Sequence, residues 1–204
     1  MNKKTKQTLY TILIFAAGIV LGILAGYIGI KASGGGTILR TIGEIGSGLA
    51  LWAFLGTLIA YYSKNPKLAA FRVLLFYLGI LVSYYICASL WAGVPPLKEI
   101  GKWLILAVVA ALAGALIWFA KRKGWFGAFC AALPIGFLAA EGRFFYQTLK
   151  TDQIVTIIFA FVLFLLLPRQ KGQRARAVPF MILIVLISIK FDVIAGLIQG
   201  LLKM

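Results

Sequence analysis

Uncharged apolar runs of membrane-spanning length constrain this chain more than any other feature of its sequence. The first covers residues 9–30, and similar runs recur to the end of the chain, separated by short segments rich in lysine and arginine. A helix needs about 20 apolar residues to cross the ~30 Å hydrocarbon core of a bilayer. A soluble domain could not keep a polar surface with 62% hydrophobic residues. We therefore expect an all-α polytopic membrane helix bundle.

The pattern of these runs predicts seven spans within a single transmembrane domain, residues 1–204. We place them at residues 8–30, 45–62, 69–91, 103–120, 125–146, 152–167 and 178–202. The first run exceeds the ~7–15-residue apolar core of a signal peptide, so we expect it to be retained. Lys190 and Asp192 interrupt the last segment, which either crosses the membrane, lies at its surface or turns back.

The distribution of positive charge predicts how the chain is oriented. Of the 21 lysines and arginines, 13 lie before the first span and near residues 64–72, 121–123 and 169–176. Cytoplasmic loops carry such an excess, so we expect a cytoplasmic N-terminus in a bacterial cytoplasmic membrane, with anionic lipids at the basic inner loops. All five acidic residues fall on the other side. Because the basic residues occur in short tracts between apolar runs, we do not expect a nucleic-acid partner despite the net charge of +16.

Three glycines recur at every fourth position of the first run, at Gly18, Gly22 and Gly26. Small residues with this spacing leave a groove along one helix face, where another helix backbone can approach closely. We expect that neighbour to be a helix of the same chain. A second copy, giving a homo-oligomer, and a different membrane protein stay open as alternatives.

The last three spans are too short for the membrane. Their uncharged cores, residues 125–140, 154–167 and 178–189, hold 16, 14 and 12 residues, which is about 24, 21 and 18 Å of helix. The shortfall lies toward the outside, where each helix has a charged pair: Glu141 and Arg143, Lys150 and Asp152, and Lys190 and Asp192. Because charges are costly in lipid, we hypothesise an outward-facing polar vestibule walled by these spans, with Glu44 at its rim. Snorkelling side chains, local thinning of the bilayer or upright short helices would explain the same pattern.

The motifs that mark common classes of enzyme are missing. The chain has no histidine, and Ser47 has no evident base to activate it. No pair of carboxylates has one-turn spacing, and Cys87 and Cys130 lie at predicted depths roughly 20 Å apart, too far for a disulfide. We therefore expect no catalytic residue, no metal and no cofactor.

Residues 51–85, LWAFLGTLIAYYSKNPKLAAFRVLLFYLGILVSYY, contain Trp52, a Ser-Lys-x-Pro turn at 63–66 and the pair Tyr84-Tyr85. With the later basic turn AKRKGWFGAF at residues 120–129, this stretch resembles an uncharacterised family of small bacterial multi-pass membrane proteins. The resemblance implies the same architecture. It implies no activity and assigns no functional residue.

Three functions are compatible with these features. The first is small-solute transport, or the role of a substrate-binding membrane subunit, through the vestibule. The alternative is a non-catalytic structural or regulatory partner that docks to another membrane protein through the glycine face of the first helix. A lipid-acting enzyme is the third, and the missing motifs speak against it.

Overall fold

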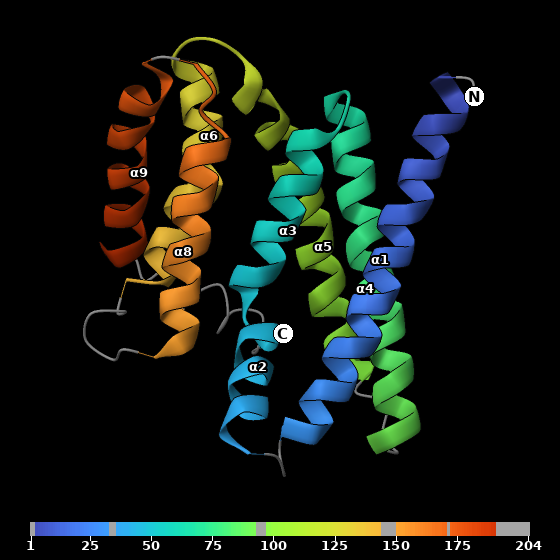
Figure 1. The fold of residues 1–204 in the computed structure, drawn as a ribbon. Helices are drawn as coiled ribbons and strands as arrows, with labels where there is room; N and C mark the ends of the chain where they lie inside the picture. The colour runs from blue at the N-terminus through green and yellow to red at the C-terminus, as the bar shows by residue number, and fades with distance from the viewer. Residues whose placement is uncertain (1–2, 33–35, 93–96, 144–149, 171, 191–204) are drawn as a thin grey trace.

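The computed structural model describes residues 3–32, 36–92, 97–143, 150–170 and 172–190. These residues form helices and short connections, with no β-strand among them, which confirms the all-α prediction (Figure 1). The elements are α1 (Lys3–Ala32), α2 (Thr37–Ser47), α3 (Leu49–Tyr62), α4 (Pro66–Ala92), α5 (Leu97–Trp118), the 3₁₀ turn η1 (Phe119–Lys121), α6 (Trp125–Glu141), α8 (Thr151–Leu166) and α9 (Gln173–Lys190).

Three helical segments are long and apolar enough to cross a membrane: Thr5–Gly29 in α1, Pro66–Leu90 in α4 and Ile100–Lys121 in α5 and η1. The bent pair α2–α3 adds a fourth if it is taken as one broken span. The apolar helices α6 and α8 have 17 and 16 residues, or roughly 25 and 24 Å. Length and composition in the described residues thus support a membrane helix bundle with three or four spans, and the seven-span count stays a prediction.

The predicted second span, residues 45–62, is wrong as a single helix. The chain instead breaks at Gly48, and α2 and α3 meet at an angle of 53°. Gly48 is extended there, with φ −71° and ψ 144°, and donates its N–H to the carbonyl of Glu44. Glycine is a poor helix former, and Ser47 also donates its hydroxyl to the Glu44 carbonyl. The resulting α2 begins eight residues earlier than the predicted span.

Other predicted boundaries also move, and α5 begins at Leu97 rather than at residue 103. The fifth span was expected to reach residue 146, but α6 ends at Glu141, where Gly142 closes the helix with bonds to two preceding carbonyls. The last helix, α9, begins at Gln173 rather than at residue 178, and it includes Pro179. The outer part of the predicted last span, with Asp192, lies outside the described residues.

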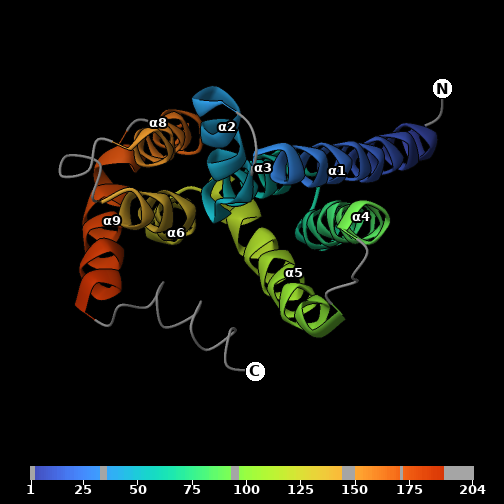
Figure 2. The ribbon, with the colours of Figure 1, turned by 90° about the horizontal axis from the view of Figure 1, so that it is seen from below.

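The helices form two groups joined by α3 (Figures 1 and 2). In one group α4 packs between α1 and α5, and in the other α6 packs between α8 and α9. The best buried side chains line the contact of α3 with α6 and α8, and include Tyr61, Ile135, Leu138 and Leu163. Large apolar side chains on α1, α5 and α9, such as Leu13, Val109 and Leu186, are exposed instead. An apolar outer surface of this kind is suited to contact with lipid.

The described acidic residues lie at one end of the bundle, whereas lysine and arginine occur at both ends. The basic end consists of the first turns of α1 and the connections α3–α4, η1–α6 and α8–α9, all at the top of Figure 1. The acidic end is the opposite one, and Glu44, Glu141 and Asp152 lie in its helix termini. None of the described acidic residues belongs to the basic end. This separation agrees with the alternation of charge expected from the sequence.

Cations at the basic end contact aromatic rings and main-chain carbonyls. Lys121 Nζ donates to the carbonyl of Ser63 at 2.8 Å and lies 5.3 Å from the centroid of the Tyr61 ring. The guanidinium of Arg169 lies over the same ring, also at 5.3 Å. The buried side chain of Gln173 donates to a carbonyl of η1 at 2.8 Å. These contacts tie the three basic connections together, and cation–π attraction adds to their stability.

Candidate functional site

A small polar pocket lies at the acidic end, between α2, α3, α6 and α8. Its volume is about 40 Å³, enough for about three water-sized groups. Its polar lining consists of Glu44, Glu141, Asp152, Gln153 and Thr156, and its apolar lining includes Ile45, Leu49, Val155 and Phe159. The pocket, which we call the acidic pocket, therefore combines three carboxylates from three helices with an apolar wall.

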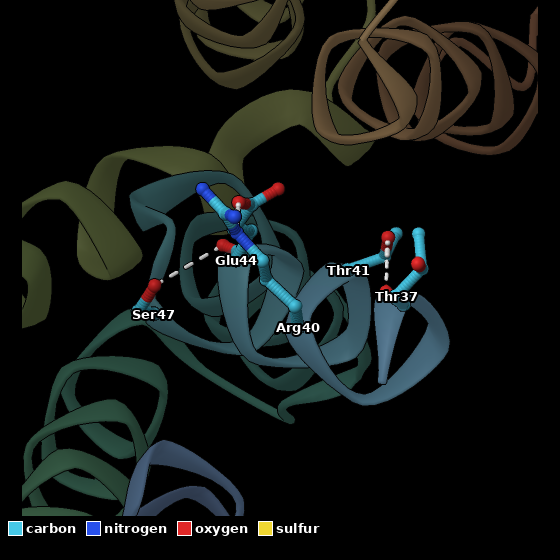
Figure 3. Close-up of polar contacts among 5 residues, drawn as sticks. All are labelled: Thr37, Arg40, Thr41, Glu44 and Ser47. Atoms are coloured by element: carbon cyan, nitrogen blue, oxygen red, sulfur yellow. Dashed lines mark hydrogen bonds and ion pairs between the residues drawn. The ribbon is translucent and has the colours of Figure 1, made fainter. Parts of the chain in front are cut away.

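Glu44 reaches the pocket from α2, whose sequence is amphipathic. The polar face of this helix consists of Thr37, Arg40, Thr41, Glu44 and Ser47 (Figure 3). Arg40 Nε donates to Glu44 Oε1 at 3.2 Å, and this ion pair is well exposed. Exposed pairs one turn apart contribute only about 0.3–0.5 kcal/mol. The ion pair therefore binds the Glu44 carboxylate to Arg40 only weakly.

Glu141 is the last residue of α6 and is partly buried. Arg143, just beyond the helix, and Asp152 are both close enough to interact with it electrostatically. The Arg143 side chain also donates from Nη1 to the carbonyl of Ala140 at 3.1 Å. Glu141 thus has a cation on one side and a second carboxylate on the other.

Asp152 lies in the first turn of α8, where the helix dipole favours a negative charge. Its Oδ1 is buried and has no hydrogen-bond partner among the described residues, and the same holds for Gln153 Oε1. The Thr156 hydroxyl does not satisfy them, because it donates to the main-chain carbonyl of Asp152 at 2.8 Å. Two buried acceptors in the wall of the pocket therefore lack a donor, and such a group costs about 1–3 kcal/mol.

The structure brings some of the predicted vestibule residues together and leaves others apart. Glu44 and Glu141 line one pocket, with Arg143 beside Glu141. Lys190 is exposed at the end of α9 and does not line it, and Asp192 lies outside the described residues. The walls are formed by α2, α3, α6 and α8, without α9. The sequence analysis did not include Gln153 and Thr156. The feature that could have indicated them is the polar start of an otherwise apolar helix, with Thr156 one turn after Asp152.

The glycine face of α1 is occupied by α4. A Cβ atom at Gly18 would collide with the carbonyl oxygen of Phe76, and one at Gly22 would lie 2.5 Å from the carbonyl oxygen of Ile80. At Gly26 it would lie 3.2 Å from Cys87 Cβ. In return, a Cβ at Gly79 of α4 would lie 2.8 Å from the Phe15 carbonyl oxygen of α1. The two backbones are therefore in direct contact, and the neighbour of the glycine face belongs to the same chain.

The two cysteines and Ser47, the other residues considered for chemistry, are buried or hydrogen-bonded to the main chain. Cys87 and Cys130 are both buried and not disulfide-bonded. Within the described part of the chain, no three histidine, cysteine or acidic residues are grouped closely enough to hold a metal ion. The hydroxyl of Ser47 donates to the Glu44 carbonyl at 3.2 Å. The acidic pocket is thus the site in which polar groups from separate helices converge at this end.

Comparison with protein-family models, with curated proteins and with solved structures found no match to this chain. The resemblance of residues 51–85 and 120–129 to small bacterial multi-pass membrane proteins stays a prediction. The acidic pocket is therefore interpreted from its own chemistry.

Proposed function

We propose that this protein is a solute-binding protein of a bacterial cytoplasmic membrane, acting as a small-solute transporter or as its substrate-binding membrane subunit, and that the solute binds in the acidic pocket. The observation that supports this most directly is the set of acceptors without donors. Asp152 Oδ1 and Gln153 Oε1 are buried without a partner, and Glu44 and Glu141 line the same space. A small ligand with several N–H donors and a positive charge would satisfy the two acceptors that lack a donor and would be attracted by the carboxylates.

The size of the pocket limits the solute. A volume of about 40 Å³ accommodates about three non-hydrogen atoms. Ammonium and methylammonium fit this limit and bring at least three donors each. The proposed substrate class is therefore small primary amines and ammonium, and larger cations without N–H groups are excluded.

The break between α2 and α3 supports access to the pocket. Transporters build substrate sites at interrupted helices, since the interruption lets polar groups reach the middle of a bundle. Here Gly48 lies both at the 53° bend and in the lining of the pocket. A change of the bend angle would move Glu44 relative to Asp152 and open or close the site. The excess of lysine and arginine at the basic end supports an orientation in which the acidic pocket faces outward.

The alternative function, docking to another membrane protein through the glycine face, has less support. The face it requires is filled by α4, at Gly18, Gly22 and Gly26 alike. A partner would have to displace α4 to reach it. Exposed apolar side chains elsewhere on α1, such as Leu13 and Val20, could contact lipid and a partner equally well.

Ligand-dependent stability tests the proposal. The protein is reconstituted in phosphatidylcholine nanodiscs, and its thermal unfolding is followed in ammonium, methylammonium, tetramethylammonium or sodium chloride at equal ionic strength. Ammonium or methylammonium at 100 times its dissociation constant should stabilise the fold by about 2.7 kcal/mol, or roughly 5–10 °C. Tetramethylammonium, which has no N–H donor, should act only as sodium does.

Two variants locate the effect, and a third serves as control. Asp152→Asn and Glu141→Gln keep the shape of the pocket but remove a charge, so each should abolish the stabilisation by ammonium and methylammonium. Lys190→Gln changes a charge at the same end outside the pocket lining and should preserve it. The proposal is wrong if neither amine stabilises the unmodified protein, or if stabilisation survives in both pocket variants.

A further inference from the structure

A second and larger cavity lies at the basic end, between α1, α3 and α4. Its volume is about 550 Å³, and it is partly open to the surface. One part of its wall is polar, with Gln7, Lys64 and Arg72, and another is apolar, with Ile14, Leu58 and Ile59. The cavity is separate from the acidic pocket because it lies at the opposite end of the helices.

Arg72 is the most deeply buried cation in the wall of this cavity. Only 5% of Arg72 is exposed. The residue lies six positions after the start of α4, or about 9 Å along the helix. Its Nε donates to Thr11 Oγ1 at 3.1 Å, and Nη2 donates to the carbonyl and the side-chain oxygen of Gln7 at 3.1 and 3.0 Å. All three acceptors are neutral. Nη1 makes no hydrogen bond to any described residue.

The charge of Arg72 is thus oriented but not neutralised. Buried charges in proteins are normally paired, because an unpaired charge in an apolar environment is very costly. None of the described acidic residues belongs to the basic end, and Lys64 adds a second cation to the same cavity. No counter-ion for Arg72 lies among the described residues. Arg72 Nη1 and Lys64 Nζ belong to residues of the cavity wall and suit an anion with several oxygens.

The remainder of the wall indicates what is attached to that anion. Ile14, Leu58 and Ile59 form an apolar surface beside the two cations, and Tyr10 and Tyr62 add amphipathic rings that are 59% and 60% exposed. Tyrosine favours the boundary between lipid headgroups and hydrocarbon. A depth of about 9 Å along α4 is consistent with this boundary. A ligand with a phosphate and an acyl chain matches both parts of the wall.

We propose that this cavity binds one anionic phospholipid, with its phosphate between Arg72 Nη1 and Lys64 Nζ and an acyl chain along Ile14, Leu58 and Ile59. The lipid supplies the negative charge that the described residues of the basic end lack, and it fills the space between α1, α3 and α4. It acts there as a structural ligand, distinct from the loose attraction of other basic residues to the membrane surface.

Native mass spectrometry tests the proposal on the purified full-length chain in mild detergent. The probes are dioleoylphosphatidylglycerol, dioleoylphosphatidylcholine and inorganic phosphate. We expect one phosphatidylglycerol to be retained per chain, at least tenfold more strongly than phosphatidylcholine, with no displacement by millimolar phosphate. Equal retention of both lipids would refute the charge argument. Displacement by inorganic phosphate, or its binding without lipid, would assign the site to a soluble phosphate and refute the lipid.

Paired variants separate this cavity from general attraction to the basic end. Lys64→Gln should weaken phosphatidylglycerol binding about fivefold, the contribution of one cation near a lipid surface. Lys67→Gln removes the same charge from an exposed residue of α4 that does not line the cavity, so it should change binding less than twofold. Equal weakening by the two variants would show diffuse binding and overturn the proposal.

A second pair of variants tests the proposed position of the acyl chain. Ile14→Trp fills the apolar wall and should reduce the bound lipid to the level of phosphatidylcholine. Ile12→Trp places the same side chain on α1 at a residue that is 58% exposed and outside the lining, and it should leave binding unchanged. Unchanged binding in Ile14→Trp would place the lipid elsewhere. The Lys64 comparison decides the question on its own if Ile14→Trp does not fold.

Discussion

Replacement of Gly22 by alanine adds one methyl group at the closest part of the α1–α4 contact. The new Cβ would lie 2.5 Å from the carbonyl oxygen and 2.9 Å from the Cα of Ile80, where ordinary contacts begin near 3.4 Å. It would also collide with Ser83 Oγ, which is held by bonds to the carbonyls of Gly79 and Ile80. Because the obstacle is backbone, α1 must move away from α4 by about 0.9 Å at this point.

The expected loss follows from that displacement. A gap of 0.5–1 Å forfeits about a quarter to a half of the dispersion energy of the atoms on each side. In lipid the hydrophobic effect does not drive helices together, so packing of this kind is a main source of association. Overpacking of one methyl group costs about 1–3 kcal/mol. The better helix propensity of alanine returns up to about 1 kcal/mol, which leaves a net destabilisation of about 1–2 kcal/mol.

Gly29 provides a matched control on the same helix. A Cβ at Gly29 would have no atom of the described residues within 4 Å, so Gly29→Ala should be neutral or stabilising by up to about 1 kcal/mol. Thermal unfolding in detergent should therefore separate the two variants by roughly 2–12 °C. Gly18→Ala should behave as Gly22→Ala does, and Gly26→Ala, with its 3.2 Å contact to Cys87 Cβ, should fall between. Equal midpoints for Gly22→Ala and Gly29→Ala would refute the close α1–α4 contact.

Three further predictions concern the basic end and the orientation. Gln173→Leu removes the buried donor to the carbonyl of η1 and should destabilise the fold by about 1–3 kcal/mol in thermal unfolding. The control Gln170→Leu, at a partly buried residue of the same connection, should cost less than about 0.5 kcal/mol. Tyr61→Phe removes a 3.3 Å bond from the hydroxyl to the main-chain carbonyl after α8 and should cost about 1 kcal/mol, measured in the same way. In intact cells, a membrane-impermeant maleimide should label Lys150→Cys but not Lys123→Cys, and the reverse pattern would contradict the expected orientation.

The sequence was informative where a property depends on local composition or on the order of segments. Apolar runs of sufficient length predicted helices for most of the chain, since a backbone in lipid must satisfy its own hydrogen bonds. The alternation of lysine-rich and acid-containing segments predicted two ends of different charge. The four-residue spacing of Gly18, Gly22 and Gly26 predicted a flat helix face, because residues four apart lie on the same side of a helix.

Boundaries were less predictable because they depend on competing local bonds. A helix break could occur at Gly43, Gly46 or Gly48. In the structure the break is at Gly48, which is extended, and the N–H of Gly48 and the hydroxyl of Ser47 both donate to the Glu44 carbonyl. The end of α6 depends in the same way on Gly142. These are small differences in energy between neighbouring residues, which an apolar pattern does not resolve.

What the sequence by itself determined is therefore the class of protein, the division of charge between its ends and the existence of a close-packing face. Only the tertiary structure decided that α4 covers this face, that Glu44, Glu141 and Asp152 line one pocket, and that Arg72 is buried beside Gln7, 65 residues earlier in the chain. The physical reason is that each of these contacts joins helices distant in sequence. In a membrane, lipid solvates any apolar helix face equally well. The neighbour of each helix is therefore selected by packing and by the few polar groups that need a hydrogen-bond partner.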